Sequence, residues 1–77
     1  MENRNVDLYR KLKFNIAYQR KLKNMSQLQL AEKIGISRTH ASNIEAPSGK
    51  GGMSLDTLFD IARVLEIPVE KLFEFRD

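Results

Sequence analysis

The sequence predicts an all-α fold of five helices. Apolar residues recur at spacings of three and four along most of the chain, which is typical of amphipathic helices. Residues that favour helix N-caps stand immediately before several of these runs. No segment of four or more residues alternates cleanly between apolar and polar positions, so no sheet is expected. We expect the 77 residues to form a single domain, 1–77, that has no cysteine to staple it.

The first helix is expected over about residues 6–23. Leu8, Leu12 and Ile16 recur there every four positions, with basic residues between them. Asn24 follows, and asparagine tolerates the left-handed backbone that commonly ends a helix. The first helix therefore has one apolar face for the core and an otherwise basic surface.

Two short helices are expected next, joined by a tight corner. Ser26 and Gln29 have the spacing of a capping box, which opens the second helix. Gly35 ends that helix, and Ser37 is the N-cap of a third helix that runs to about Glu45. The proline that follows shortly after Glu45 prevents further continuation, and a glycine-rich loop comes next.

The last two helices are expected in the C-terminal third. Ser54 is the N-cap of a fourth helix, in which Leu58, Ile61 and Leu65 form an apolar stripe. Pro68 suits the first turn of a short fifth helix that ends in a run of apolar residues.

The net charge of +3 conceals a gradient along the chain. Residues 1–24 carry seven basic and two acidic side chains, for a net charge of +5, whereas residues 54–77 carry three basic and six acidic ones, for −3. The segment between them, 25–53, is nearly neutral at +1. Such a gradient can orient a small domain on a polyanion with its basic end inward, although a basic solvated helix face would give the same count.

Several classes of function are excluded by what the sequence lacks. No apolar run approaches the ~18 residues of a membrane span, and residues 1–7 have no signal-peptide core. A single histidine and no cysteine remove most acid–base and zinc schemes, and we find no nucleophile–base pair, carboxylate pair with a pocket, or phosphate loop. No metal or cofactor is expected. We therefore expect a cytoplasmic protein that is not an enzyme.

The strongest indication of function lies in residues 26–45. Two short capped helices joined by a corner at Gly35 have the layout of a helix-turn-helix, whose second helix enters the major groove of DNA. The outward face of that second helix carries Arg38, Thr39, Ser42 and Asn43. These side chains can form hydrogen bonds with base edges.

Together these motifs resemble the Cro/CI-type (XRE) helix-turn-helix regulators of bacteria and phages. The resemblance runs over about residues 12–73 and rests on two patterns. The first is Gln27-x-x-Leu30-Ala31-x-x-x-Gly35-Ile36-Ser37-Arg38-x-x-x-x-x-Ile44-Glu45. The second is Ser54-Leu55-x-x-Leu58-x-x-Ile61-Ala62-x-x-Leu65. The resemblance implies a lambda-repressor-like fold and a sequence-specific DNA-binding transcriptional regulator.

The resemblance also implies roles for individual residues. Base contacts are expected from Arg38, Thr39 and Asn43. Phosphate contacts are expected from Gln27, His40, Ser42 and Lys50. His40 could equally pack against the first helix, Ser42 could be plain surface, and Lys50 could belong to a solvated loop. Arg20 and Glu45 are expected to form a structural salt bridge between the first and third helices.

The expected partner is double-stranded DNA, bound by a homodimer on a palindromic operator. The dimer interface is expected within about residues 54–77, from the terminal apolar residues Leu72, Phe73 and Phe75. With one domain and nothing left over for sensing, no small-molecule effector is expected. The alternative is a protein-interaction module of antitoxin or anti-regulator type that keeps the fold without binding DNA.

Overall fold

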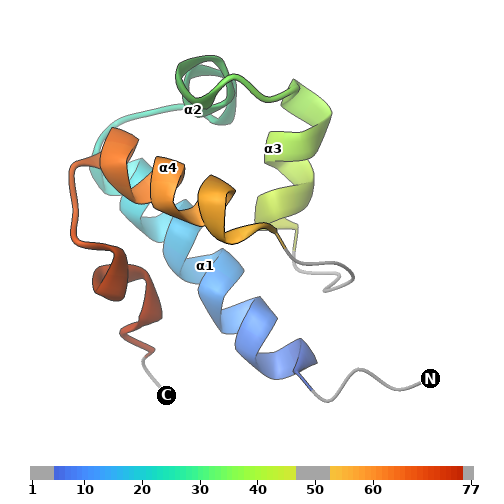
Figure 1. Cartoon of the computed structure of the whole chain (residues 1–77), viewed down its shortest axis with the longest axis vertical. Helices are drawn as coiled ribbons and strands as arrows, with labels where there is room; N and C mark the ends of the chain where they lie inside the picture. Colours follow the sequence, from blue (N-terminus) through green and yellow to red (C-terminus); the bar gives the residue numbers. More distant parts are fainter. Residues whose placement is uncertain (1–4, 47–52, 76–77) are drawn as a thin grey trace.

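The protein is described here from a computed structural model, which defines residues 5–46 and 53–75. Four α-helices and a terminal 3₁₀-helix follow one another: α1 (Val6–Leu22), α2 (Gln27–Ile34), α3 (Arg38–Glu45), α4 (Leu55–Leu65) and η1 (Val69–Phe73). The described residues contain no strand, and the all-α prediction is confirmed. Figure 1 shows α4 lying across α1, α2 capping one end of the bundle, and α3 and η1 on opposite sides of α1.

The local signals that begin and end the helices act as the sequence predicts. Ser26 and Gln29 form a complete capping box at the start of α2, and Ser54 accepts a hydrogen bond from the Thr57 amide at the start of α4. Asn24 and Gly35 both adopt left-handed backbone conformations, with φ of 56° and 77°. Each of these devices satisfies amide or carbonyl groups that a helix end leaves without an intrahelical partner.

Helix α1 packs against α3, α4 and η1, and its apolar stripe contributes to the common core. Ile16 is fully buried and Leu12 nearly so. They join a core cluster to which α2, α3, α4 and η1 each contribute. Its other buried members are Leu30, Ile44, Leu58, Ile61, Ala62, Leu65 and Leu72.

Two details of the C-terminal third differ from expectation. The fifth helix is a 3₁₀-helix, and Pro68 is its N-cap in an extended conformation, not a residue of its first turn. Helix α4 ends on Glu66, whose φ of 58° lies in the left-handed region that usually favours glycine or asparagine.

The C-terminal segment is tied to α1 by Asn15. The side chain of Asn15 donates to the carbonyl oxygens of Leu72 and Glu74, at 2.9 and 3.3 Å.

Candidate nucleic-acid interface

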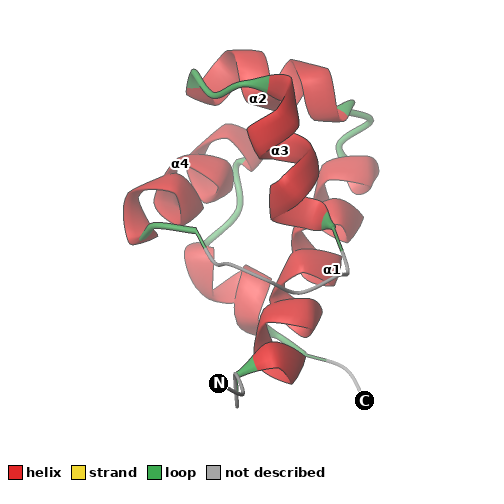
Figure 2. Ribbon diagram, turned by 90° about the vertical axis from the view of Figure 1, so that its right-hand side faces the viewer, coloured by secondary structure: helices red, strands yellow, loops and turns green. Residues whose placement is uncertain are grey.

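The corner between α2 and α3 is closed by backbone hydrogen bonds. The amides of Gly35 and Ile36 both donate to the carbonyl oxygen of Ala31, at 2.9 and 3.0 Å. Ala31 is buried, which keeps the junction of the two helices close. The hydroxyl of Ser37 then accepts from the His40 amide at 3.0 Å and so starts α3 in a new direction. In Figure 2 α3 lies at the front of the molecule, on its outer surface.

Helix α3 has two chemically distinct faces. Its inner face consists of Ala41 and Ile44, which are 2% and 4% exposed. The five side chains on its outer surface are all polar and exposed: Arg38, Thr39, His40, Ser42 and Asn43. The structure thus brings the predicted base-contacting residues together on one exposed helix. The exposure of His40 does not favour the alternative in which it packs against α1.

The last residue of α3 is held by a buried ion pair. The Nε atom of Arg20 lies 2.6 Å from Oε2 of Glu45, and its Nη2 atom lies 2.9 Å from Oε1. Both side chains are less than a tenth exposed. Nη1 of Arg20 also donates to the carbonyl oxygen of Met25 at 2.6 Å. Because Glu45 is engaged in this inward contact, its negative charge does not face a molecule bound on the outer side of α3.

Gln27 belongs to the same network. Its Nε2 atom donates to Oε1 of Glu45 at 3.0 Å, which connects the first residue of α2 to the last residue of α3. Gln27 remains half-buried, at the edge of the exposed surface. Its side chain therefore braces α3 while lying close to the exposed polar face.

A second anchor of α3 was missed at the level of the sequence. Lys13 of α1 is 3% exposed, and its Nζ atom donates to the carbonyl oxygen of Asn43 at 3.1 Å. A cation is favourable at that position because the last carbonyl groups of a helix carry partial negative charge. The available signal was spacing: Lys13 precedes Ile16 by three residues and Arg20 by seven, so it lies on the inward stripe of α1.

The remaining predicted site residues have different outcomes. Lys50 lies outside the described residues. Leu72 is fully buried in the core of the chain, so its assignment to a dimer interface is wrong: it has no surface to offer a second copy. Phe73, by contrast, is 47% exposed, and Phe75 is half-buried. The centroids of their two rings are 6.2 Å apart.

No helix among the described residues is both long and apolar enough to cross a bilayer. The described residues also hold no cluster of side chains suited to a metal ion.

Comparison with known proteins agrees with this geometry. A helix-turn-helix family model matches residues 16–72, from the middle of α1 to η1. Over 62 residues the chain is 42% identical to the cryptic phage CTXphi transcriptional repressor RstR of Vibrio cholerae serotype O1, a match that covers 80% of this chain and 54% of that repressor. The chain thus spans about half the length of the phage repressor.

A second relative is matched over nearly its whole length. The chain is 36% identical over 66 residues to the uncharacterized HTH-type transcriptional regulator MJ0272 of Methanocaldococcus jannaschii. This match covers 86% of this chain and 97% of that protein. The family match extends over most of the chain and includes the corner, both capped helices and the Arg20–Glu45 ion pair. The chain therefore belongs to the Cro/CI-type helix-turn-helix family, whose members are DNA-binding transcriptional regulators and not enzymes.

Proposed function

We propose that this chain is a sequence-specific transcriptional regulator that inserts α3 into the major groove of double-stranded DNA. The observation that carries the proposal is the division of α3 into a buried, doubly anchored side and an exposed, wholly polar side. Arg38 and Thr39, at the N-terminal end of α3, would contact base edges, and Asn43 would contact a base one turn further along.

Phosphate contacts would flank these base contacts. The Gln27 amide has two N–H donors, and one of them is directed to Glu45. We assign the other to a phosphate oxygen, so that one side chain braces α3 and positions the duplex. His40 and Ser42, both exposed on α3, would contact phosphates beside the same groove. A phosphate contact is likewise proposed for Lys50.

We further propose that two copies bind a palindromic operator with half-sites about one helical turn apart. One domain of this size reads only a few base pairs, and a second copy supplies the missing specificity. Phe73 offers exposed apolar surface in the acidic C-terminal third, with half-buried Phe75 beside it, where a phosphate backbone would be repelled. That charge favours a protein contact at this end of the molecule.

Selection of bound sequences from a random duplex pool tests the base-reading role. The wild-type chain should enrich a defined sequence, and Arg38→Ala should relax preference at one position of each half-site, a discrimination of about 1–3 kcal/mol. Arg63→Ala is the matched control, because it removes the same charge from an exposed arginine on α4 that pairs with Asp60. Failure to bind any duplex at low salt would contradict the proposal and favour the protein-interaction alternative.

The same selection tests the dimer. Two-fold symmetric sites with a constant spacing are expected, and sedimentation should show Phe73→Ser shifting the population toward monomer. A single asymmetric half-site, bound by a monomer at concentrations that saturate the DNA, would contradict the homodimer without affecting the assignment of α3.

A further inference from the structure

The outward face of α1 carries an apolar stripe that neither the core nor α3 uses. Phe14, Tyr18 and Leu22 follow one another at intervals of four residues, so they neighbour one another along one side of the helix. Their exposed fractions are 69%, 39% and 57%. The rings of Phe14 and Tyr18 are stacked, with centroids 6.5 Å apart and planes at 11°. Large side chains exposed together in this way commonly mark an interaction surface.

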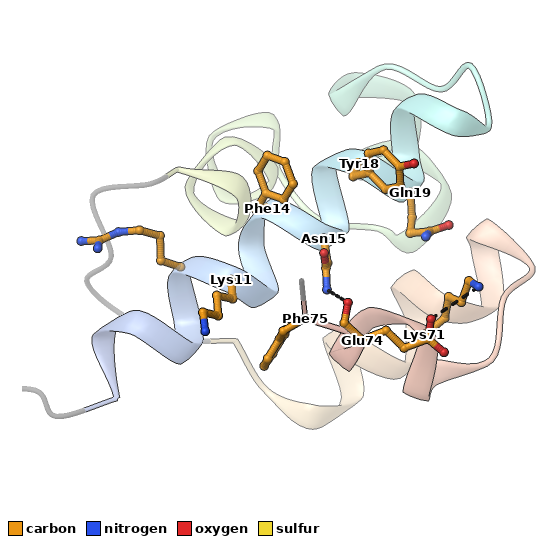
Figure 3. A pocket seen from close by; sticks show the side chains of 9 residues that line it. Lys11, Phe14, Asn15, Tyr18, Gln19, Lys71, Glu74 and Phe75 are labelled. Carbon is orange, nitrogen blue, oxygen red and sulfur yellow. Dashed lines mark hydrogen bonds and ion pairs between the residues drawn. The ribbon is translucent and has the colours of Figure 1, made fainter. Parts of the chain in front are cut away.

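The aromatic part of this stripe forms one wall of a groove of about 440 Å³, which we call the α1 groove. Phe14, Tyr18 and Gln19 line it from α1, and Lys71, Glu74 and Phe75 line it from the C-terminal segment (Figure 3). The two hydrogen bonds from Asn15 to the C-terminal carbonyl groups hold the walls together. The groove is therefore formed before any partner binds, which lowers the entropic cost of binding.

The charge around the α1 groove is positive. Arg10, Lys11 and Lys71 line it together with one carboxylate, that of Glu74, and Arg10 also lies 3.3 Å from the carboxylate of Asp7 on the same helix. Glu74 lies 3.5 Å from the Lys71 ammonium, which offsets its charge. A second copy docked by the same face would bring an equally positive groove against this one, and that repulsion opposes self-association here. The complementary surface is apolar and acidic.

We propose that the α1 groove binds an acidic amphipathic helix of a partner protein. Apolar residues spaced three and four apart on that helix would lie on the Phe14–Tyr18 stack and against Phe75, in the manner of other helix-in-groove complexes. Carboxylates beside its apolar stripe would face Arg10, Lys11 and Lys71 and would increase the association rate. Figure 1 places α3 and the C-terminal segment on opposite sides of α1, so the groove is separate from the DNA-facing surface. The proposal thus does not depend on the proposed DNA contacts, but it shares Phe75 with the proposed dimer interface, so a second copy and the partner helix would compete for this residue.

A synthetic peptide provides a defined probe. It has about 18 residues, enough for appreciable helix formation, with leucine and tryptophan at spacings of three and four and glutamate on both flanks. Two further peptides serve as controls: one with the same composition in scrambled order, and one with lysine in place of glutamate. Fluorescence anisotropy with the full chain at low salt should show binding of the designed peptide at least about tenfold tighter than either control.

Variants locate the binding on the protein. Phe14→Ser and Tyr18→Ser should each weaken the designed peptide about tenfold or more, as expected for aromatic contacts at the centre of an interface. Phe59→Ser is the matched control, because Phe59 is an exposed phenylalanine on α4 and does not line the groove. Arg38→Ala should leave peptide binding unchanged even if it impairs DNA binding, so the two proposals fail independently. Circular dichroism verifies that each variant keeps its helical content.

Several results would overturn the proposal. These are absence of binding, equal binding of the scrambled peptide, or equal loss with Phe59→Ser. Displacement of the designed peptide by random duplex DNA, with DNA affinity lost in Phe14→Ser, would make the α1 groove part of the DNA surface instead. Binding of phosphatidylserine vesicles that is lost in Phe14→Ser, with no binding of the peptide, would identify the stripe as a membrane-contacting face.

Discussion

Replacing Glu45 by alanine would leave the guanidinium of Arg20 buried without its counter-ion. In the wild-type structure this group makes two contacts with Glu45, at 2.6 and 2.9 Å, and one with the Met25 carbonyl oxygen. Only the last remains in the variant. The Nε2 atom of Gln27 also loses its acceptor. The change therefore removes the main compensation for a charge that the fold keeps away from water.

The expected cost is large compared with the stability of a small domain. Breaking a buried ion pair by removing one partner typically costs about 3–5 kcal/mol. At about 0.05–0.15 kcal/mol per residue, a chain of 77 residues has a free energy of unfolding of about 4–12 kcal/mol. Glu45→Ala should thus remove a quarter or more of the stability and lower the melting temperature by at least about 12 °C.

Urea unfolding followed by circular dichroism at the helical band measures the effect. Asp60→Ala is the control, because it breaks an exposed ion pair with Arg63 and should cost no more than about 1 kcal/mol. The combined Arg20→Met and Glu45→Leu variant should recover much of the loss, since an apolar pair of similar volume often replaces a buried ion pair without penalty. A double-mutant cycle built from Arg20→Met, Glu45→Leu and the combined variant then yields a coupling energy of up to about 3 kcal/mol.

The reasoning fails if Glu45→Ala unfolds within about 1 kcal/mol of the wild type. It also fails if stability is unchanged while the preferred DNA sequence is altered, because Glu45 would then act at the DNA surface. A strongly destabilised variant whose sequence preference is retained at low temperature is the expected outcome.

Other features of the same region make further predictions. Gly35→Ala should cost about 1–2 kcal/mol in thermal melts through its φ of 77°, since no atom within 4 Å would obstruct the added carbon, and Gly35→Asn should cost less. Ser37→Ala should cost about 1 kcal/mol by the same measurement, because the His40 amide loses its cap. Lys13→Met should lower urea stability by about 1–2 kcal/mol, whereas Lys11→Met at an exposed position should change it by less than about 0.5 kcal/mol. Affinity for random duplex DNA should fall steeply between about 50 and 200 mM salt, and salt-independent binding would contradict phosphate contact by α3.

The parts of the fold that follow from neighbouring residues could be predicted from the sequence. Ser26, Ser37 and Ser54 begin helices by bonding to amides three residues ahead, and Gly35 ends one through its own backbone freedom. The direction of each apolar stripe also follows from spacing alone. These features need no knowledge of how the helices pack.

The errors concern features that depend on packing. Among Leu72, Phe73 and Phe75, only the 3₁₀ geometry of η1 and its contact with α1 decide which side chain is buried, and the sequence offers three equally apolar candidates. In the sequence, Lys13 is one of several charged residues on a basic helix. Only the packing of α3 against α1 brings the carbonyl oxygen of Asn43 to its Nζ atom. The left-handed Glu66 gave no local signal, because glutamate carries no preference for that conformation.

The two anchors of α3 have a consequence for how such a protein can change over generations. Both run from α1 to the last turn of the helix, through Lys13 to the Asn43 backbone and through Arg20 to the Glu45 side chain. Neither uses the side chain of Arg38, Thr39 or Asn43. Substitutions on the exposed side of α3 could therefore redirect the protein to a different operator while both anchors of α3 stay intact. Descendants of one fold could in this way acquire separate genetic targets with little loss of stability.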